Sequence, residues 1–227
     1  MHTSLWKIAG YWMIVSGVIA IIIGYLLGAI PSAYIAARLV TGKDIRQLGS
    51  GTVGSFNVYR EVGAKSGVAV AMADMGKGTV AVAIAHQLLG VAQPFVLAAA
   101  LAAIIGHMWT PFLKFRGGMG MGTTVGVMAI LLPLYGYGQQ LLIFFGVVAV
   151  PLFITRNIAL SMFVALLALP IILWVGTKSI PLTILAAVIF VVMGLKFLPT
   201  ARAAWARAEN KKAFFFDRSL MLRRGKK

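Results

Sequence analysis

"IAGYWMIVSGVIAIIIGYLLGAIPSAYIAA", residues Ile8 to Ala37, is an apolar run that contains no charged residue. A membrane-spanning helix needs about 20 apolar residues, whereas the apolar part of a cleavable signal peptide has roughly 7–15. The run is far longer than the apolar part of a signal peptide. We therefore expect the first membrane helix here rather than a leader that is removed.

The composition of the whole chain agrees with a membrane location. Of its 227 residues, 60% are hydrophobic and only 11% are charged, whereas a soluble domain is about half apolar and a quarter charged. A globular core of this length could not bury so much apolar surface. There is no cysteine, which excludes disulfides, thiolate catalysis and metal sites built from cysteine.

Seven apolar segments are long enough, or nearly long enough, to cross a bilayer. We therefore predict an all-α membrane protein with about seven transmembrane helices. The segments are residues 10–36, 67–89, 94–112, 120–138, 140–154, 158–175 and 180–197.

Lys and Arg alternate between the connections that join these segments. Residues 37–66 and the connection with Lys114 and Arg116 are basic, whereas residues 86–94 and 133–140 carry no Lys or Arg. Basic loops stay in the cytoplasm. The pattern predicts an outside N-terminus, a cytoplasmic C-terminus and three loops on the cytoplasmic side: the two glycine-rich loops and the "TRN" turn.

The net charge of +16 comes largely from the end of the chain. Ten of the 21 Lys and Arg residues fall between Lys196 and the C-terminus, against two acids, Glu209 and Asp217. Cations near anionic lipid each contribute about 1 kcal/mol to membrane binding, and no nucleic-acid-binding module accompanies the charge. We predict a membrane domain at 1–197 and a basic cytoplasmic tail at 198–227, with membrane lipids and not nucleic acid as partners.

The stretch "RQLGSGTVGSFNVYREVG", residues 46–63, contains G-x-G-x-x-G at Gly49, Gly51 and Gly54, with Asp74 twenty residues beyond. A dinucleotide fingerprint requires a buried strand before the glycines and a βαβ unit around them. Here an apolar helix and a charged linker precede the glycines, and Asp74 lies inside the next apolar segment. The context argues against NAD.

The same glycines can hold another phosphate. Glycine permits positive φ, so that successive backbone N–H groups form a nest for an anion. Arg60 supplies a cationic fork suited to phosphate, and further donors come from Ser50, Thr52, Ser55 and Asn57. The alternative is a flexible polar turn. The richness of the stretch in donors favours an anion site.

A second glycine-rich loop, "GHMWTPFLKFRGGMGMGTT" at residues 106–124, has the same character. Lys114 and Arg116 supply charge, and the glycines are Gly117, Gly118, Gly120 and Gly122. Two interpretations stay open. The loop binds an anion, or its cations mark the cytoplasmic side while its glycines allow close helix packing.

Ionisable residues also occur within the apolar segments. Asp74 and Lys77 are three apart, so they share a helix face and can pair. Charged groups at membrane depth point to function, and the alternative is a self-neutralising structural ion pair of Asp74 with Lys77. His107 ends the third segment, either as a base or phosphate donor or as an interfacial histidine bonded to backbone.

Four motifs together resemble those of one family, the bacterial integral-membrane glycerol-3-phosphate acyltransferases that use acyl-phosphate as donor. The family pattern G-S-G-N-x-G-A-T-N-x-x-R resembles residues 49–60, and D-x-x-K-G appears at Asp74, Lys77 and Gly78. The pattern G-H-x-x-x-x-F-L-x-F-K-G-G-K-G resembles residues 106–120, and T-x-x-x-S-L-S-S resembles "TRNIALSM", residues 155–162. The likeness covers nearly the whole chain.

The chain departs from the family at several motif positions. The second lysine of K-G-G-K-G is Met119 and the first is Arg116, while the first-motif asparagine is Thr52. The family's C-terminal R-H-x-x-N has no histidine here in either register, "GLKFLP" or "ARAEN". A methionine cannot neutralise a phosphate. The loss of such a charge partner typically costs more than about 2 kcal/mol of binding free energy in a desolvated site.

The resemblance implies transfer of an acyl group from acyl-phosphate to the 1-hydroxyl of glycerol 3-phosphate, at the bacterial inner membrane and without metal or cofactor. Ser50, Asn57, Arg60 and His107 would be the catalytic set. The substrate-binding set would be Gly49, Gly51, Gly54, Lys77, Lys114, Arg116, Gly117, Gly118 and Gly120. The other known acyltransferase pattern, H-x-x-x-x-D, is absent, because Lys7, Val91 and Phe112 stand at the acid's position.

Two further functions stay open on the sequence. An anion transporter would use the same basic loops but should show an ionisable path through the membrane, whereas the ionisable residues here collect on one side. A weakened or inactive paralogue that acts as a binding or scaffold protein would explain Met119. The sequence leaves the oligomeric state open.

Overall fold

A computed structural model describes residues 2–207, and the helices in it begin and end close to the predicted segments. The chain divides into two compact units between Leu131 and Leu132. The described residues contain helices and no strands. The predicted all-α fold class is confirmed. Of the predicted tail, residues 198–207 continue the last helix, and residues 208–227 lie outside the described part.

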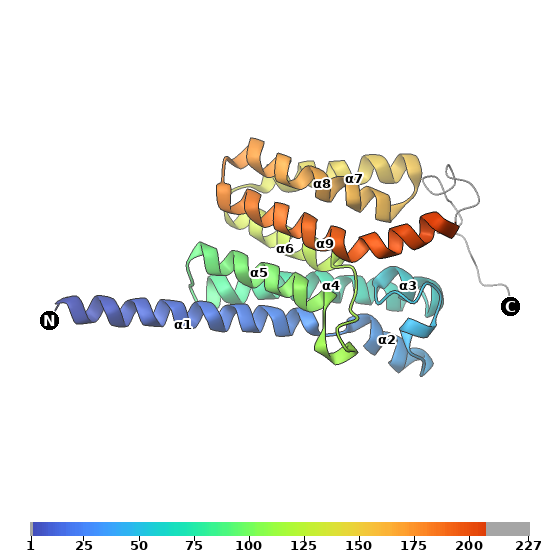
Figure 1. The fold of residues 1–227 in the computed structure, drawn as a ribbon, viewed down its shortest axis with the longest axis horizontal. Coiled ribbons are helices and arrows are strands. Elements are labelled where there is room, and N and C mark those ends of the chain that lie inside the picture. The colour runs from blue at the N-terminus through green and yellow to red at the C-terminus, as the bar shows by residue number, and fades with distance from the viewer. Residues whose placement is uncertain (1, 208–227) are drawn as a thin grey trace. The chain divides into compact units, whose positions relative to one another are not determined.

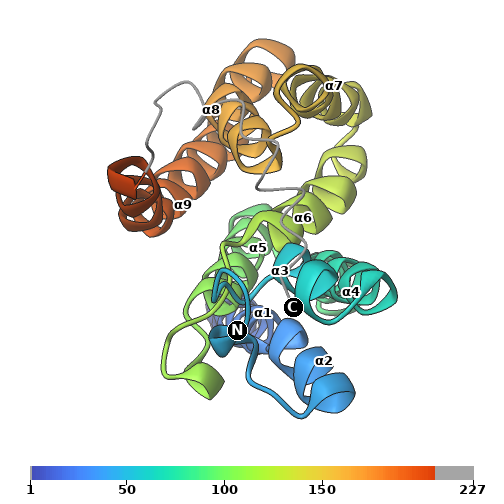
Figure 2. The same ribbon diagram turned by 90° about the vertical axis from the view of Figure 1, so that its right-hand side faces the viewer.

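The first unit is built on a long helix, α1 (His2–Ala29), that packs against α5 (Gln93–Met108) and α4 (Ala64–Ala83). Two short helices follow the end of α1: α2 (Ser32–Thr41) and α3 (Ser55–Glu61). Figures 1 and 2 show α2 and α3 beside the end of α4. A π-helical turn, Ile84–Leu88, closes α4, and α6 (Met121–Leu134) begins after the second glycine-rich loop.

The second unit contains α7 (Gly138–Thr155), α8 (Ile158–Thr177) and α9 (Ile180–Arg207). Helix α8 packs against both α7 and α9. Each helix of this unit begins within a few residues of the end of the one before it, as short connections between antiparallel neighbours require.

Six helical stretches are long and apolar enough to cross a membrane. They are Gly10–Thr41, Ala64–Leu88, Gln93–Leu113, Gly138–Thr155, Leu160–Thr177 and Ile180–Pro199. The predicted segment 120–138 forms α6, which has 14 residues and a length of about 21 Å, short of the roughly 30 Å hydrocarbon core. The multi-pass character is confirmed. The count of seven and the orientation stay predictions.

The first predicted span, 10–36, is not one helix. Helix α1 ends at Ala29 and α2 begins at Ser32. Pro31 separates them, because its ring lacks an N–H and disfavours a helical residue before it. The side chain of Thr110 donates to Ala29 O (2.6 Å) and that of Lys77 to Ile30 O (3.1 Å). The carbonyls at the break after α1 are therefore satisfied by side chains from α4 and from the segment that follows α5.

Glycines set the distance between α1 and α5. A Cβ at Gly28 would overlap the carbonyl oxygen of Ala103, and one at Gly106 would overlap that of Tyr25. Gly24 and Gly28 form a G-x-x-x-G pair on α1, the arrangement that lets membrane helices approach closely. The tight contact holds the end of α1 against α5, which carries His107.

We expect Gly28→Ala to destabilise the protein by about 1–3 kcal/mol, because the added methyl group has no room against the α5 backbone. Gly76→Ala in α4 is the matched control, since a Cβ there meets nothing within 4 Å. Thermal unfolding of both purified variants in detergent measures the difference. Equal midpoints for the two variants would contradict the packing described above.

Candidate functional site

Asp74 on α4 is buried among polar side chains of α2, α4 and α5. Its Oδ1 lies 3.0 Å from Ser32 Oγ at the start of α2, 2.8 Å from Lys77 Nζ and 3.5 Å from His107 Nδ1 on α5. Asp74, Lys77 and His107 are 5%, 7% and 8% exposed. The buried carboxylate therefore joins α2, α4 and α5 at one point.

Lys77 is used inside the protein. Besides the ion pair with Asp74, its ammonium donates to Ile30 O at the break between α1 and α2. An ammonium has three N–H donors, so these two bonds leave one. The geometry makes Lys77 a link between α4 and the end of α1, and its contact with substrate stays a prediction.

Asn57 organises the first glycine-rich loop. Its Nδ2 donates to Ile45 O (3.3 Å), Leu48 O (3.0 Å) and Thr52 O (3.0 Å), and its Oδ1 accepts from Ser50 N–H (3.2 Å). The side chain is 3% exposed. We therefore revise the expectation that Asn57 contacts substrate, because its two N–H groups are occupied by the loop that it holds in place.

The rest of this loop is more accessible. Ser50 is exposed, and its hydroxyl lies 2.8 Å from that of Thr52. Arg60 is half-buried, with its guanidinium 4.3 Å from the centre of the Phe56 ring. This cation–π contact orients the guanidinium.

The glycines of the first loop serve different purposes. Gly49 and Gly51 have positive φ, +52° and +71°, as expected of a nest. The N–H of Gly51 donates to Leu48 O within the turn. Gly54 precedes α3 in an extended conformation with open space around it. The turn therefore depends on Gly49 and Gly51 for its conformation.

The second glycine-rich loop packs against the first. A Cβ at Gly118 would overlap His107 Nε2 and crowd the carbonyl oxygen of Val53. The N–H groups of Gly117 and Gly118 donate to Met108 O (3.1 Å) and His107 O (3.0 Å). Both predicted anion donors are thus bonded within the protein, and Gly118 serves the close approach of the two loops.

The side chains of the second loop divide into one buried anchor and two exposed cations. Leu113 is buried in a small apolar cluster with Ile45, Val53 and Val58 of the first loop region. Lys114 and Arg116 are exposed, and Lys114 takes positive φ at +55°. The anchor holds both cations beside the first loop. Gly120, with φ of +85°, is buried and opens α6.

The predicted third loop belongs to the second unit. Arg156 ends α7 with φ of +55°, and the side chain of Asn157 caps α8 by accepting from Leu160 N–H (3.1 Å). These contacts account for the conformation of the turn. The expectation that it joins the other two loops stays a prediction.

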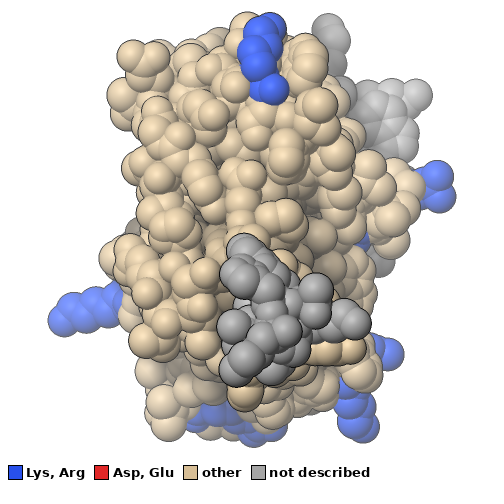
Figure 3. Space-filling model, turned by 90° about the vertical axis from the view of Figure 1, so that its left-hand side faces the viewer, with Lys and Arg blue, Asp and Glu red and all other residues tan. Residues whose placement is uncertain are grey.

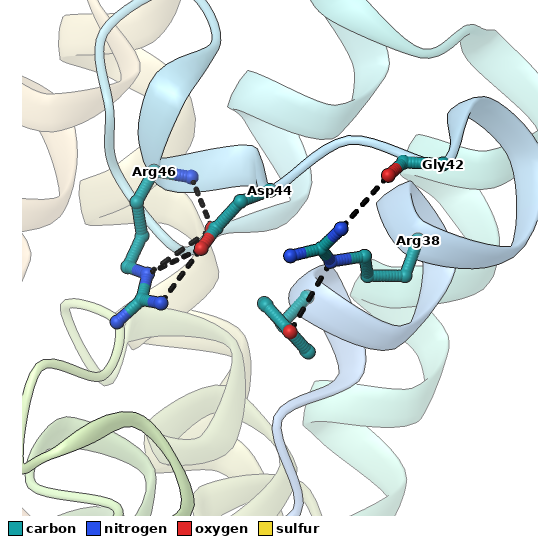
Figure 4. Close-up of polar contacts among 5 residues, drawn as sticks. Arg38, Gly42, Asp44 and Arg46 are labelled. Carbon is teal, nitrogen blue, oxygen red and sulfur yellow. Dashed lines mark hydrogen bonds and ion pairs between the residues drawn. The ribbon is translucent and has the colours of Figure 1, made fainter.

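An ion pair fixes the entry to the first loop, and sequence reasoning missed it. Asp44 accepts from Arg46 Nε (3.1 Å) and Nη2 (2.6 Å) and from Arg46 N–H (2.9 Å), as Figure 4 shows. These hydrogen bonds lower the pKa of Asp44 below its ordinary value of 3.8. The D-x-R spacing is a signal for such a turn, because an Asp side chain commonly accepts from the N–H two residues on.

Known proteins match this chain along most of its length. The family model described as glycerol-3-phosphate acyltransferase matches residues 18–205. The chain belongs to this family. It is 43% identical to "Glycerol-3-phosphate acyltransferase 1" of Dehalococcoides mccartyi, covering 87% of this chain and 95% of the relative. A Geobacter sulfurreducens glycerol-3-phosphate acyltransferase is 38% identical over 83% of this chain and 94% of the relative.

Solved structures of an acyltransferase of this family resemble the fold. The crystal structure of PlsY (YgiH), an integral membrane glycerol 3-phosphate acyltransferase, in its glycerol 3-phosphate form has a TM-score of 0.75 and 29% identity. The match covers 84% of this chain and 92% of that one. The lysophosphatidic acid form gives a TM-score of 0.73 and 28% identity. The family inferred from the four motifs is thereby confirmed.

Among the described residues of this acyltransferase-family chain, no group of three or more His, Cys, Asp or Glu could hold a metal ion. The groups available at the junction of the two loops are hydroxyls, cations and backbone. Such groups bind and orient anions.

Asn57→Ala should cost about 1–3 kcal/mol of stability, because three buried or part-buried carbonyls lose their donor. Ser50→Ala is the control within the same loop, since its exposed hydroxyl contacts only Thr52. Chemical or thermal unfolding in detergent compares the two. If Ser50→Ala lowered the stability as much as Asn57→Ala does, the distinction between a loop-anchoring Asn57 and an accessible Ser50 would be refuted.

Asp44→Asn tests the ion pair without removing the side-chain acceptor for Arg46 N–H. The pKa of Asp44 is lower in the folded protein than in the unfolded chain. The ion pair therefore stabilises the folded protein at pH values above the unfolded pKa. This stabilisation is lost as the pH falls through the folded pKa. We expect wild type to be more stable by about 1 kcal/mol near neutral pH. That difference should shrink below about pH 3.8, as thermal unfolding between about pH 7 and pH 3 would measure. A constant difference over this range would rule out the charge as its source.

Proposed function

We propose that this chain transfers an acyl group from an acyl-phosphate to the 1-hydroxyl of glycerol 3-phosphate. The products are lysophosphatidate and inorganic phosphate, as a step of phospholipid synthesis. The observation that carries the proposal is the contact of the two glycine-rich loops beside His107, where a Cβ at Gly118 would overlap His107 Nε2 and crowd Val53 O. Arg60 lies on α3, which follows the first loop. The proposal is supported by the match along most of the chain to structures described as glycerol 3-phosphate and lysophosphatidic acid forms.

The reaction asks for positioning more than for a strong base. The hydroxyl oxygen attacks the carbonyl carbon of the mixed anhydride, the bond from that carbon to the phosphate oxygen breaks, and phosphate leaves with the electron pair. The hydroxyl proton ends on a phosphate group, since both reactants carry one. The protein holds two anions side by side and stabilises the tetrahedral oxyanion.

Cations and hydroxyls at the loops supply that positioning. Arg60 and Ser50 are the proposed phosphate or oxyanion contacts of the first loop, and Lys114 and Arg116 are those of the second. His107 is proposed as a hydrogen-bond donor. Asn57, Asp74 and the glycines at 117 and 118 act as positioning groups, because their polar atoms bond within the protein.

The loops are proposed to face the cytoplasm of a bacterium, across its inner membrane. The alternation of Lys and Arg between segments supports this orientation. In Figure 3, which views the end where α1 begins, the described residues show no acidic side chain, and their Lys and Arg side chains stand apart from one another. Glycerol 3-phosphate is water-soluble and would reach the loops from that side, while the acyl chain stays among the apolar helices.

The transporter and the scaffold functions are not favoured. The relatives that the chain matches along most of its length are named acyltransferases. Met119, half-buried between Gly118 and Gly120, is the position at which a loss of activity would arise.

To test the proposal, the protein is purified in detergent and given glycerol 3-phosphate with acyl-phosphate, acyl-coenzyme A or acyl-carrier protein as donor. We expect lysophosphatidate and phosphate in equal amounts with acyl-phosphate only. Arg60→Ala should lower kcat/KM at least about tenfold, since a charge-assisted contact contributes about 1.5–3 kcal/mol. Met119→Lys should raise kcat/KM by adding a cation.

The outcomes of this assay separate the functions. Product with wild type that disappears in Arg60→Ala supports the acyltransferase. No product with wild type, restored by Met119→Lys, identifies a decayed site. No product from either protein with any donor would reject the proposal in favour of a binding or transport function.

A further inference from the structure

Two arginines share one tyrosine where the chain leaves its first span. The guanidinium carbons of Arg38 and Arg46 lie 5.4 Å and 5.8 Å from the centre of the Tyr34 ring. Arg38 Nε donates to Tyr34 Oη (3.2 Å) and Nη1 to Gly42 O (2.8 Å). Figure 4 shows the bond from Arg38 to Gly42 beside the ion pair of Arg46 with Asp44. The two cations are therefore held in place by short polar and ring contacts.

The location of this cluster follows from the length of α1. Residues 10–29 alone are about 20 residues and about 30 Å long, enough to cross the hydrocarbon core. Helix α2 begins after the break at Pro31 and turns away from the axis of α1 in Figure 1. A span formed by residues 10–29 would place α2 at the level of the lipid headgroups.

The outer face of α2 is apolar with an arginine among the apolar residues. Ile35, Leu39 and Val40 are 41%, 81% and 59% exposed, while Ala33 and Ala37 are buried toward the rest of the unit. Arg38 is exposed on the same helix. This combination is typical of a helix that lies in the membrane interface.

The charges of the segment remain unbalanced, and some donors are unused. Asp44 offsets one of the three cations Arg38, Lys43 and Arg46. Nη2 of Arg38 and Nη1 of Arg46 make no hydrogen bond to another described residue. A guanidinium fork matches the oxygens of a phosphate group, and the ring contacts reduce the freedom that each arginine would lose on binding.

We propose that Tyr34, Arg38 and Arg46, the α2 basic cluster, bind the phosphate headgroup of an anionic membrane lipid. The apolar face of α2 next to the cluster would lie along the acyl chains of that lipid, which a free phosphate ion does not have. The cluster contains none of the residues given a role in acyl transfer, so this inference goes beyond the proposed function. A bound headgroup would also hold the turn that leads into the first glycine-rich loop.

The experiment measures lipid binding to the full-length protein in detergent by native mass spectrometry. Dioleoylphosphatidylglycerol is the anionic probe and dioleoylphosphatidylcholine the zwitterionic one. We expect tighter binding of phosphatidylglycerol to wild type, and a loss of about fivefold in affinity in Arg38→Gln and in Arg46→Gln, since one cation near anionic lipid contributes that factor. Phosphatidylcholine binding should not change.

Lys65→Gln is the matched control, because Lys65 is an exposed cation at the start of α4, outside the cluster. It should leave phosphatidylglycerol affinity within about twofold of wild type. Arg38→Gln keeps the Asp44–Arg46 pair, so it decides the question should Arg46→Gln unfold. Unchanged affinity in Arg38→Gln would overturn the proposal, and so would an equal loss in Lys65→Gln.

Discussion

The first unit depends on the buried carboxylate of Asp74. Asp74 accepts from Ser32 and Lys77 and lies 3.5 Å from His107 Nδ1, and these side chains come from α2, α4 and α5. A buried charge is tolerated only when it is paired and hydrogen-bonded, and breaking such a pair typically costs about 3–5 kcal/mol. The requirement to satisfy Asp74 therefore fixes how the three helices meet. Both glycine-rich loops are attached to those helices.

Around Asp74, the helices associate through close packing, because burial of apolar surface gives little driving force inside a membrane. Lipid is as apolar as a leucine side chain, so membrane helices associate through backbone contact and interhelical hydrogen bonds. Glycine faces backbone where α1 meets α5 and where α4 meets α6. Thr79 Oγ1 adds a bond to Gly126 O (3.0 Å) between α4 and α6. Polar bonds at the end of α1 and small residues along its length thus act together.

Sequence reasoning identified the elements well and the uses of individual polar groups less well. Apolar runs of about 20 residues predict membrane helices, and the order of four motifs identified the family. Pro31 carried the signal for the break in the first span, but the apolar run on both sides of it masked that signal. The hydrogen bonds of Asn57, Gly117 and Gly118 could not be predicted, because they depend on which carbonyls the folded loops bring near. The sequence of a donor-rich loop does not distinguish donors that bind a ligand from donors that bond within the loop.

The shortness of α6 has a consequence for where the two reactants meet. If α6 crosses the bilayer, its length of about 21 Å leaves it roughly 9 Å short of the hydrocarbon thickness, and the mismatch must be met by thinning the membrane or sinking one end. The second glycine-rich loop is joined to the start of this helix. A loop drawn below the headgroup plane would let the acyl carbonyl stay at its natural depth. Glycerol 3-phosphate would then enter a locally thinned part of the bilayer, and the acyl donor would not have to leave the bilayer.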